Sequence, residues 1–431
     1  MQKKLLTLAV AGALAAPGIA SAQSSVEVYG FVQLAFGSWK FKDATDQATN
    51  PDVSKFDVTS GASNVGVRGR ETLGGGLSAW FQVETNAGME RSNNVAHTSG
   101  FASRNSAVGV QGGFGNVFLG QWTSPWADLD ALWAIGTVGP FGPVTAIIGR
   151  RETTGAANNF NCANVGSGVP AAPGTNCDSV EGAGGVGHPF WRRMSNSIHY
   201  NTPVFAGGIQ GKIAYQVNQD KTNAPAGVVQ NPQMYSTSLQ WAGMGGRARV
   251  GVAYDGHKDF TTPGKTDTGW AVKGGWNFGV VDVGLAYERM TYKTPASDCK
   301  AQQYAAAVSV PVGQGAIKAS YAKAKDIEGT YSGPVTTFTG ASGLSPTGSC
   351  GATPTAVNHS DDNGATQWNI GYDHRFSKRT TIGVGYSTIK NDAGTGTFVW
   401  SGMSSTQNGV SLAPPIGTDI SVLFVNMIHR F

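Results

Sequence analysis

Residues that could perform catalysis or hold a metal occur in this sequence, but their spacing does not match the sites that they would form. The run Gly264-Lys265-Thr266 resembles the end of a phosphate-binding loop. However, Asp259 stands where such a loop begins with glycine and no helical pattern follows, so we interpret the run as a hairpin tip. The seven histidines are scattered without an H-E-x-x-H motif, and the four cysteines form no C-x-x-C pair. Sequence spacing does not test for a Ser/His dyad, because neighbours in a sheet can be distant along the chain. We expect neither an enzyme nor a bound metal or cofactor.

The residues that could act on ions are charged side chains that share one face of successive strand-like segments. In residues 281–288 the odd positions are apolar and the even positions are polar or small, which is the period of two of a strand with one apolar face. Residues 209–217 and 247–255 repeat this pattern, with charged, amide or glycine residues on the other face. A soluble sandwich could use such strands too. Charges and glycines on strand after strand favour a membrane barrel with a wet interior and apolar side chains toward lipid.

Connections between these segments alternate between short and long. Seven are tight and rich in glycine, at residues 73–75, 113–115, 203–206, 243–246, 277–279, 312–315 and 376–379. Eight are longer and polar, near residues 40–60, 91–101, 123–192, 219–231, 258–266, 293–301, 327–364 and 393–415. Together they predict an all-β fold, a sixteen-stranded antiparallel transmembrane β-barrel with its turns in the periplasm and its loops outside the cell.

The N-terminus predicts export. Lys3 and Lys4 precede an apolar stretch, and Ala20-Ser21-Ala22 fits the small-residue cleavage rule, so we interpret residues 1–22 as a signal peptide and residues 23–431 as one barrel domain. Removing the leader lowers the formal net charge from +4 to about +2, which is too little to indicate nucleic acid as a partner. Glycine, with 61 of 431 residues, is about twice as frequent as usual, and charged residues make up only 13%. Beyond the leader no apolar run reaches the ~18–20 residues of a membrane helix, so a spanning domain has to be a closed barrel.

The closing segment and several internal motifs resemble a known family. Residues 423, 425 and 427 are apolar on one face and the chain ends on Phe431, which resembles the assembly signal of outer-membrane barrels. The motifs that carry the wider resemblance are Val28-Tyr29-Gly30, Val65-Gly66-Val67-Arg68-Gly69, Leu73-Gly74-Gly75-Gly76-Leu77, Phe81-Gln82-Val83-Glu84 and, after Arg104, Val108-Gly109-Val110. These are similar to the trimeric general-diffusion porins of Gram-negative outer membranes. Asn196-Ser197-Ile198 and Phe376-Ser377-Lys378-Arg379-Thr380 resemble the β-proteobacterial branch in particular.

This resemblance implies a passive, water-filled channel for ions and small hydrophilic solutes. It further implies a homotrimer in the cell outer membrane, in contact with lipid and lipopolysaccharide. Two alternatives are a solute-specific facilitator with a binding ladder in the lumen and a barrel that acts mainly as a surface adhesin or receptor. Saturable conductance blocked by one solute class would indicate the first alternative, and a closed or very small pore would indicate the second.

The resemblance also implies a pore constriction with a basic wall. It places Asn64, Arg68 and Arg104 in that wall, on two of the early strands. Strand parity supports an inward position for Arg68 and adds Arg70, because an arginine that faces lipid at mid-depth would cost ~2–4 kcal/mol. Asn64 and Gln121 depart from the family, in which many relatives carry arginine. The alternative role of the arginines is to stabilise the barrel through salt bridges with carboxylates in the lumen.

The third long connection, residues 123–192, is implied to fold into the pore. Asp128 and Asp130 could supply an acidic side that faces Arg68 and Arg104, or they could cap or turn the loop locally. The basic residues of this connection are Arg150, Arg151, Arg192 and Arg193.

The inward-parity charges predict a weak preference for anions. The basic ones are Arg68, Arg70, Arg104, Lys212, Arg247, Arg249, Arg375 and Arg430. The acidic ones are Glu27, Glu84, Asp255, Asp282, Glu288 and Asp373. Screening over ~8 Å at physiological salt limits the effect to charges at the narrowest point.

Four cysteines in an exported chain predict disulfide bonds. Cys162 and Cys177 lie in the third long connection, and their pairing would close a short loop worth roughly 3 kcal/mol. Cys299 and Cys350 lie in neighbouring outer loops, which makes them the expected second pair.

Overall fold

A computed structural model gives the fold of the chain. It describes residues 25–89, 101–149, 190–205, 207–217, 222–223, 229–230, 233–258, 264–293, 298–332, 347–349, 362, 364–393, 398–400, 406–407, 410–411 and 417–431.

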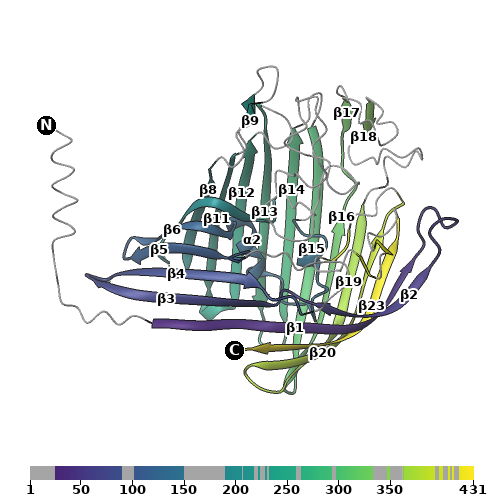
Figure 1. The fold of residues 1–431 in the computed structure, drawn as a ribbon, viewed down its shortest axis with the longest axis horizontal. Helices are drawn as coiled ribbons and strands as arrows, with labels where there is room; N and C mark the ends of the chain where they lie inside the picture. Colours follow the sequence, from purple (N-terminus) through teal and green to yellow (C-terminus); the bar gives the residue numbers. More distant parts are fainter. Residues whose placement is uncertain are drawn as a thin grey trace.

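Sixteen strands close an antiparallel ring, as the sequence predicts, and each strand pairs with the next one around the barrel (Figure 1). The ring consists of β1 (Ser25–Lys42), β3 (Asn64–Gly74), β4 (Leu77–Asn86), β5 (Ser106–Gly112), β6 (Gly115–Thr123), β7 (Arg193–Asn201), β8 (Ile209–Gln216), β11 (Gln233–Gly243), β12 (Ala248–Lys258), β13 (Thr266–Asn277), β14 (Asp282–Lys293), β15 (Asp298–Val312), β16 (Gly315–Ala324), β19 (Ala365–Arg375), β20 (Thr380–Asn391) and β23 (Asp419–Arg430). β23 pairs with β1 and closes the ring. A closed ring leaves no exposed strand edge, which is the condition for a sheet to cross a bilayer.

One strand lies where the sequence predicts a loop. β2 (Val53–Ser60) pairs with the second half of β1, whereas β3 pairs with its first half, so β2 and β3 follow each other along the same neighbour. The prediction of a loop over residues 40–60 is therefore wrong for its second part. Phe56 stacks on Phe36 of β1 with their ring centroids 5.8 Å apart. Such cross-strand aromatic pairs stabilise a sheet. This pair helps to hold β2, which lies within the predicted loop, against β1.

The remaining elements are short. Strand pairs lie at β9 (Thr222–Asn223) with β10 (Val229–Gln230), β17 (Thr330–Ser332) with β18 (Thr347–Ser349), and β21 (Thr406–Gln407) with β22 (Val410–Ser411). The helical turns are α2 (Pro125–Asp128), η1 (Leu129–Leu132), η2 (Pro143–Thr145) and η3 (Met244–Gly246). None of the helices in the described part of the chain is long and apolar enough to cross a membrane.

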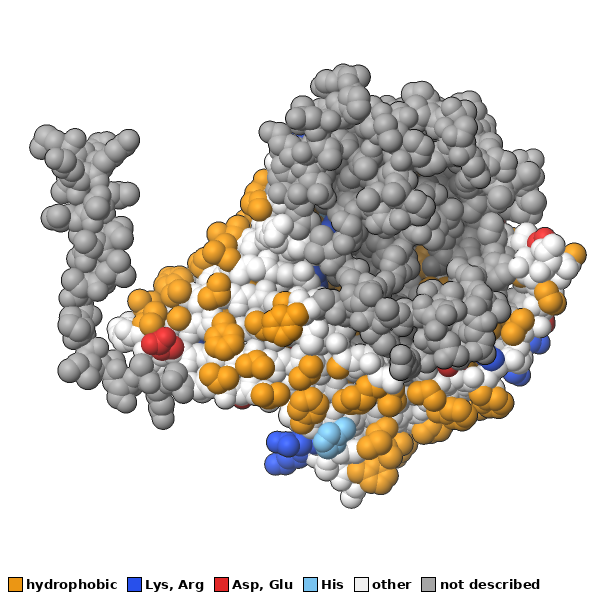
Figure 2. Space-filling view, viewed as in Figure 1, with side chains coloured by type: hydrophobic (Ala, Val, Ile, Leu, Met, Phe, Trp, Pro, Cys, Tyr) orange, Lys and Arg blue, Asp and Glu red, His pale blue; other side chains and the backbone are white. Residues whose placement is uncertain are grey.

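The two faces of the barrel wall differ as the alternating pattern predicts. On β14, Leu285 is 60% exposed and Glu288 is fully buried. On β23, Leu423, Val425 and Met427 are exposed, whereas Asn426 is buried. Figure 2 shows apolar side chains spread over the visible surface of the strands. The exposed apolar residues thus face outward, where lipid would surround the barrel. The inner face carries the polar residues and also buried apolar ones, such as Ile420, Val422 and Phe424 of β23.

The first and last strands meet at Gly30 and Phe431. The two residues exchange backbone hydrogen bonds, with Phe431 N donating to Gly30 O at 3.1 Å and Gly30 N donating to Phe431 O at 3.3 Å. A side chain at position 30 would place its Cβ only 2.3 Å from the carbonyl oxygen of Asn64, so glycine is required there. The C-terminal residue is therefore part of the seam that closes the barrel. Its role as an assembly signal stays a prediction.

Candidate functional site on the inner wall

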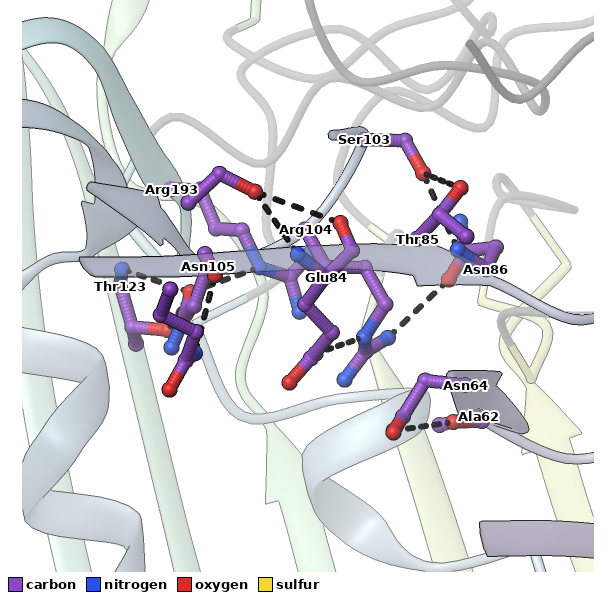
Figure 3. Close-up of polar contacts among 12 residues, drawn as sticks. Ala62, Asn64, Glu84, Thr85, Asn86, Ser103, Arg104, Asn105, Thr123 and Arg193 are labelled. Carbon is purple, nitrogen blue, oxygen red and sulfur yellow. Dashed lines mark hydrogen bonds and ion pairs between the residues drawn. The ribbon is translucent and has the colours of Figure 1, made fainter. Parts of the chain in front are cut away.

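Arg104 lies directly before β5 rather than within a strand, and it is neutralised by Glu84 of β4. Its Nε donates to Glu84 Oε1, and its Nη1 donates to Asn86 Oδ1 at 3.1 Å (Figure 3). Tyr29 Oη donates to the other carboxylate oxygen of Glu84 at 2.9 Å. The carboxylate therefore holds Arg104 in one orientation, as the salt-bridge role of the arginines requires. Such pairing also removes most of the net charge at this position.

Arg68 on β3 has a similar environment. It forms an ion pair with Glu27 of β1, and its guanidinium carbon lies 4.8 Å from the ring centroid of Tyr29. Arg70, two residues farther along β3, is exposed and has no hydrogen bond or ion pair from its side chain to any described residue. Arg68 and Arg104 are thus paired, whereas Arg70 keeps an uncompensated charge.

Asn64 connects to these residues through β4. It is the register partner of Asn86, which accepts the hydrogen bond from Arg104. Its own side-chain nitrogen donates to the carbonyl oxygen of Ala62 at 3.2 Å. The structure therefore brings the predicted basic-wall residues Asn64 and Arg104 into one neighbourhood. We call the side chains of Glu27, Asn64, Arg68, Glu84 and Arg104 the arginine cluster.

The segment after β6 contacts the inner wall on the other side of the ring. Ser124 caps α2 by accepting from Ala127 N at 3.2 Å, and Pro125 at the first helical position has no N–H to leave unpaired. This short turn presents Trp126, which is fully buried and whose backbone N donates to Ser236 Oγ of β11 at 3.2 Å. Wall glycines make room for the segment, since a Cβ on Gly284 of β14 would lie 2.1 Å from the carbonyl oxygen of Trp133.

A buried lysine between two carboxylates fastens this segment to the wall. Lys273 of β13 lies 2.7 Å from Asp130 Oδ1 and 2.8 Å from Glu288 Oε1 of β14, and the side chains of Lys273 and Glu288 are completely buried. We call Lys273, Asp130 and Glu288 the lysine cluster. One positive and two negative groups that are completely or mostly buried require further donors, because an unpaired buried charge is costly.

Indole and backbone groups supply those donors. Trp133 Nε1 and Trp191 Nε1 donate to the two oxygens of Asp130 at 2.9 Å and 2.6 Å. Trp126 Nε1 and Gly149 N donate to the two oxygens of Glu288 at 3.0 Å and 2.6 Å. Every carboxylate oxygen of the lysine cluster is therefore hydrogen-bonded. The network joins both described ends of the third long connection to β13 and β14.

The acidic residues of the segment pair with lysines. Asp128 lies 3.1 Å from Lys212 of β8, while Asp130 pairs with Lys273. Burial raises the pKa of Asp128, and the positive charge of Lys212 acts in the opposite direction. The alternation of strand residues predicts that Lys212 faces inward. The same rule applies to Lys273, which was not predicted, because this residue lies on the face opposite to the exposed Trp270. That Asp128 and Asp130 face Arg68 and Arg104 across the lumen stays a prediction.

Two more basic residues of the wall hold the same segment. Arg249 of β12 donates from Nε to the carbonyl oxygen of Leu132 at 2.6 Å and pairs with Asp282 at 2.6 Å. Lys318 of β16, which the sequence did not indicate, pairs with Asp373 at 2.8 Å and donates to the carbonyl oxygen of Thr137 at 3.4 Å. Much of the inward positive charge is thus used in ion pairs with carboxylates of the wall or of this segment.

The other predicted residues of the third connection are only partly described. The carbonyl of Arg192 accepts from Ser124 N at 3.0 Å, which ties the two ends of the connection together. Arg193 is the first residue of β7, and its Nε donates to Asn105 Oδ1 at 3.1 Å (Figure 3). Arg150 and Arg151 lie outside the described residues.

Cys299 is disulfide-bonded and buried as the second residue of β15. It lies in a strand rather than in the predicted loop of residues 293–301. Cys162, Cys177 and Cys350 lie outside the described residues, so the predicted pairings stay predictions.

Comparisons with known proteins agree with this architecture. The sequence profile of a family described as Gram-negative porin matches residues 7–394. Outer membrane porin protein 32 of Delftia acidovorans is 28% identical over 415 residues, which cover 92% of each chain. An outer membrane porin protein of Bordetella pertussis is 27% identical over 313 residues, which cover 68% of this chain and 70% of that one.

Solved structures share the fold. An anion-selective porin from Comamonas acidovorans superposes with a TM-score of 0.59 at 22% identity, covering 95% of this chain and all of the other. The trimer form of an outer membrane protein of Vibrio cholerae gives a TM-score of 0.53 at 13% identity, covering 95% of this chain and 99% of the other.

Proposed function

Because the chain belongs to the Gram-negative porin family, we propose that it acts in the cell outer membrane as a water-filled channel through which ions and small hydrophilic solutes diffuse passively. The closed ring of sixteen strands, apolar outside and charged inside, carries this proposal. Diffusion through such a lumen requires no bond to be made or broken, so we propose that the chain is not an enzyme.

Planar-bilayer recordings of the purified protein test the proposal. We expect stepwise conductance increases in KCl that stay proportional to bulk salt conductivity. Saturating conductance blocked by one solute would instead favour a specific facilitator. Inserted barrels without conductance would overturn the channel function.

Arg68, Arg70 and Arg104 with Asn64 form, in this proposal, the basic side of the narrowest region, and Asp128 and Asp130 lie on the other side. Two observations support this arrangement. β4, which carries Glu84, and β14, which carries Glu288, are eight strands apart in the ring of sixteen, so the arginine and lysine clusters stand on opposite walls. Also, the segment that contains Asp128 and Asp130 is fastened to the far wall.

Weak anion preference is the expected selectivity. Support comes from Arg70, the residue of the proposed basic side that has no ion-pair partner among the described residues. The name of the Comamonas acidovorans relative, which describes it as anion-selective, agrees with this expectation. With different KCl concentrations on the two sides of the bilayer, the reversal potential should have the sign that indicates higher permeability for chloride than for potassium. A cation-type sign would contradict it.

We propose a homotrimer in contact with lipid and lipopolysaccharide. The trimer form of the Vibrio cholerae relative supports the assembly. Three outward basic residues near the loop ends of their strands support the lipid contact: Arg289 of β14, Lys323 of β16 and Lys390 of β20. Near the membrane surface an outward charge costs little free energy, and the phosphate groups of lipids are close. Light scattering of the detergent-solubilised protein tests the trimer. Unchanged co-purification of lipopolysaccharide after R289Q/K323Q/K390Q would contradict the lipid contact.

A further inference from the structure

Aromatic side chains gather on the inner wall beside the arginine cluster. Trp80 of β4 lies 5.4 Å from Phe118 and 5.7 Å from Trp122, both of β6, measured between ring centroids. Phe118 in turn stacks on His199 of β7 at 4.7 Å. We call these four residues the aromatic patch. Barrel lumens that conduct water and ions are polar, so an aromatic patch on the inner wall needs a specific reason.

The wall is shaped to hold Trp80. A Cβ on Gly109 of β5 would lie 2.7 Å from Trp80 Nε1, so the indole lies directly against the backbone of β5 and any larger residue there would displace it. Trp80 Nε1 donates to Asn116 Oδ1 at 2.8 Å, which fixes the orientation of the ring. Trp80 and Trp122 are nevertheless only partly buried, whereas Phe118 and His199 behind them are buried. The indoles are thus fixed in place and part of their surface stays accessible.

One uncompensated cation of the wall, Arg70, stands next to this patch. Arg70 and Trp80 are register partners on β3 and β4, so their side chains leave the sheet side by side on the same face. Arg68 and Arg104 are neutralised by Glu27 and Glu84, but no described residue pairs with Arg70. A guanidinium free to bind a carboxylate therefore adjoins an indole free to stack on a ring.

We infer that Trp80, Trp122 and Arg70 form a transient binding face for planar aromatic carboxylates that pass through the lumen. The carboxylate binds the Arg70 guanidinium through charge-assisted hydrogen bonds, and the ring stacks on the accessible indole surface. Small aliphatic anions gain only the first contact, and neutral aromatic solutes gain only the second. This inference rests on the proposed channel function and adds a preferred solute class to it.

The test uses the purified full-length barrel in planar bilayers at low salt, with benzoate as the probe. Cyclohexanecarboxylate has the same charge and similar size without a π system, and acetate lacks the ring. We expect benzoate to reduce the chloride current in a saturable manner at lower concentration than either comparison anion. W80A should raise the half-blocking benzoate concentration by about three- to tenfold, in keeping with the energy of one aromatic contact, and should leave that of acetate unchanged.

Matched variants separate the inference from a general effect on the barrel. R70Q should raise the half-blocking concentrations of benzoate, cyclohexanecarboxylate and acetate alike, because each loses its carboxylate contact. R375Q, which removes an inward arginine at the corresponding end of β19, should leave these concentrations unchanged. W270A on the outward face of β13 controls for the loss of a tryptophan. Equal block by benzoate and cyclohexanecarboxylate, or a W80A channel that still prefers benzoate, would overturn the inference. Absence of any KCl conductance without benzoate would instead overturn the channel function itself.

Discussion

Neutralising Arg68 and Arg104 together should shift the channel toward cations. In the wild-type protein these arginines pair with Glu27 and Glu84, so the four charges nearly cancel. In R68Q/R104Q the two carboxylates remain, and the local charge changes by two units in the negative direction. The proposed constriction lies beside these residues, so this change should affect every permeating ion.

Coulomb's law gives the size of the shift. A monovalent ion about 7 Å from a charge in water interacts with it by roughly 0.6 kcal/mol, and screening at 0.1 M salt halves this value. Two uncovered carboxylates then stabilise potassium by about 0.6 kcal/mol and destabilise chloride by the same amount. The difference of about 1.2 kcal/mol corresponds to a change of about eightfold in the ratio of chloride to potassium permeability. At 0.01 M salt the same calculation gives about 25-fold, and at 1 M the effect nearly disappears.

Reversal potentials across a KCl gradient measure this ratio. R68K/R104K keeps the charge and should behave like the wild type, and R68Q/R104Q/E27Q/E84Q removes both pairs and should return the ratio close to its original value. R430Q, at the end of the last strand near the seam, should have a smaller effect because the lumen there is expected to be wide. If R68Q/R104Q leaves the ratio unchanged while R430Q shifts it, the constriction is placed wrongly and the arginines near β3 serve only stability.

Four further predictions concern folding, assembly and the third connection. K273M should lower the free energy of unfolding by about 3–5 kcal/mol, because it leaves Asp130 and Glu288 buried without a cation. K212M removes one partner of a partly exposed ion pair and should lower the free energy of unfolding by less than about 1 kcal/mol. Urea unfolding in detergent measures both values. Equal stability of the two variants would contradict the buried network. G284V should push the segment around Trp133 away from β14 and change single-channel conductance, whereas A306V on the outer face of β15 should leave conductance unchanged. Identical conductance of the wild type and both variants would contradict the close contact between Gly284 and Trp133. Deleting Phe431 should reduce the amount of heat-modifiable barrel in the membrane fraction without reducing export, and normal barrel levels would contradict its role. Mass spectrometry of non-reduced digests should show the pairs Cys162–Cys177 and Cys299–Cys350, and free thiols or crossed pairs would contradict that pairing.

The strand pattern could be read from the sequence because it is local. Alternation of apolar and polar residues identified both faces of β14 and β23, and glycine-rich turns gave the number of strands in the ring. The sequence did not predict β2, because β2 and β3 both pair with β1, each along one half of it. A single sequence does not reveal that β1 is long enough to pair with both. The sequence predicts Arg104 within a strand, but this residue precedes β5. Its backbone N donates to the carbonyl oxygen of Glu84 at 3.0 Å, and its side chain pairs with the Glu84 carboxylate.

The contacts of the candidate site were less predictable for a physical reason. Partners across a barrel are set by the register of strands that are far apart in the sequence, and by where an irregular segment meets the wall. Asp130 and Lys273 are separated by 143 positions, and only the fold brings them within 2.7 Å. Parity could show that Lys273 points inward, but not that it pairs with Asp130 rather than facing water.

The seam between β1 and β23 also limits the order in which the protein can assemble. Its partners, residues 31–42 and 419–430, are separated by most of the described chain. Contacts of such large sequence separation form late, because almost the whole chain has to be ordered before they become favourable. Until the seam forms, β1 and β23 each present an unpaired edge that other chains could bind. The barrel therefore depends on protection of these two edges between export and insertion, and a variant that slows the closing step should aggregate even if the finished barrel is stable.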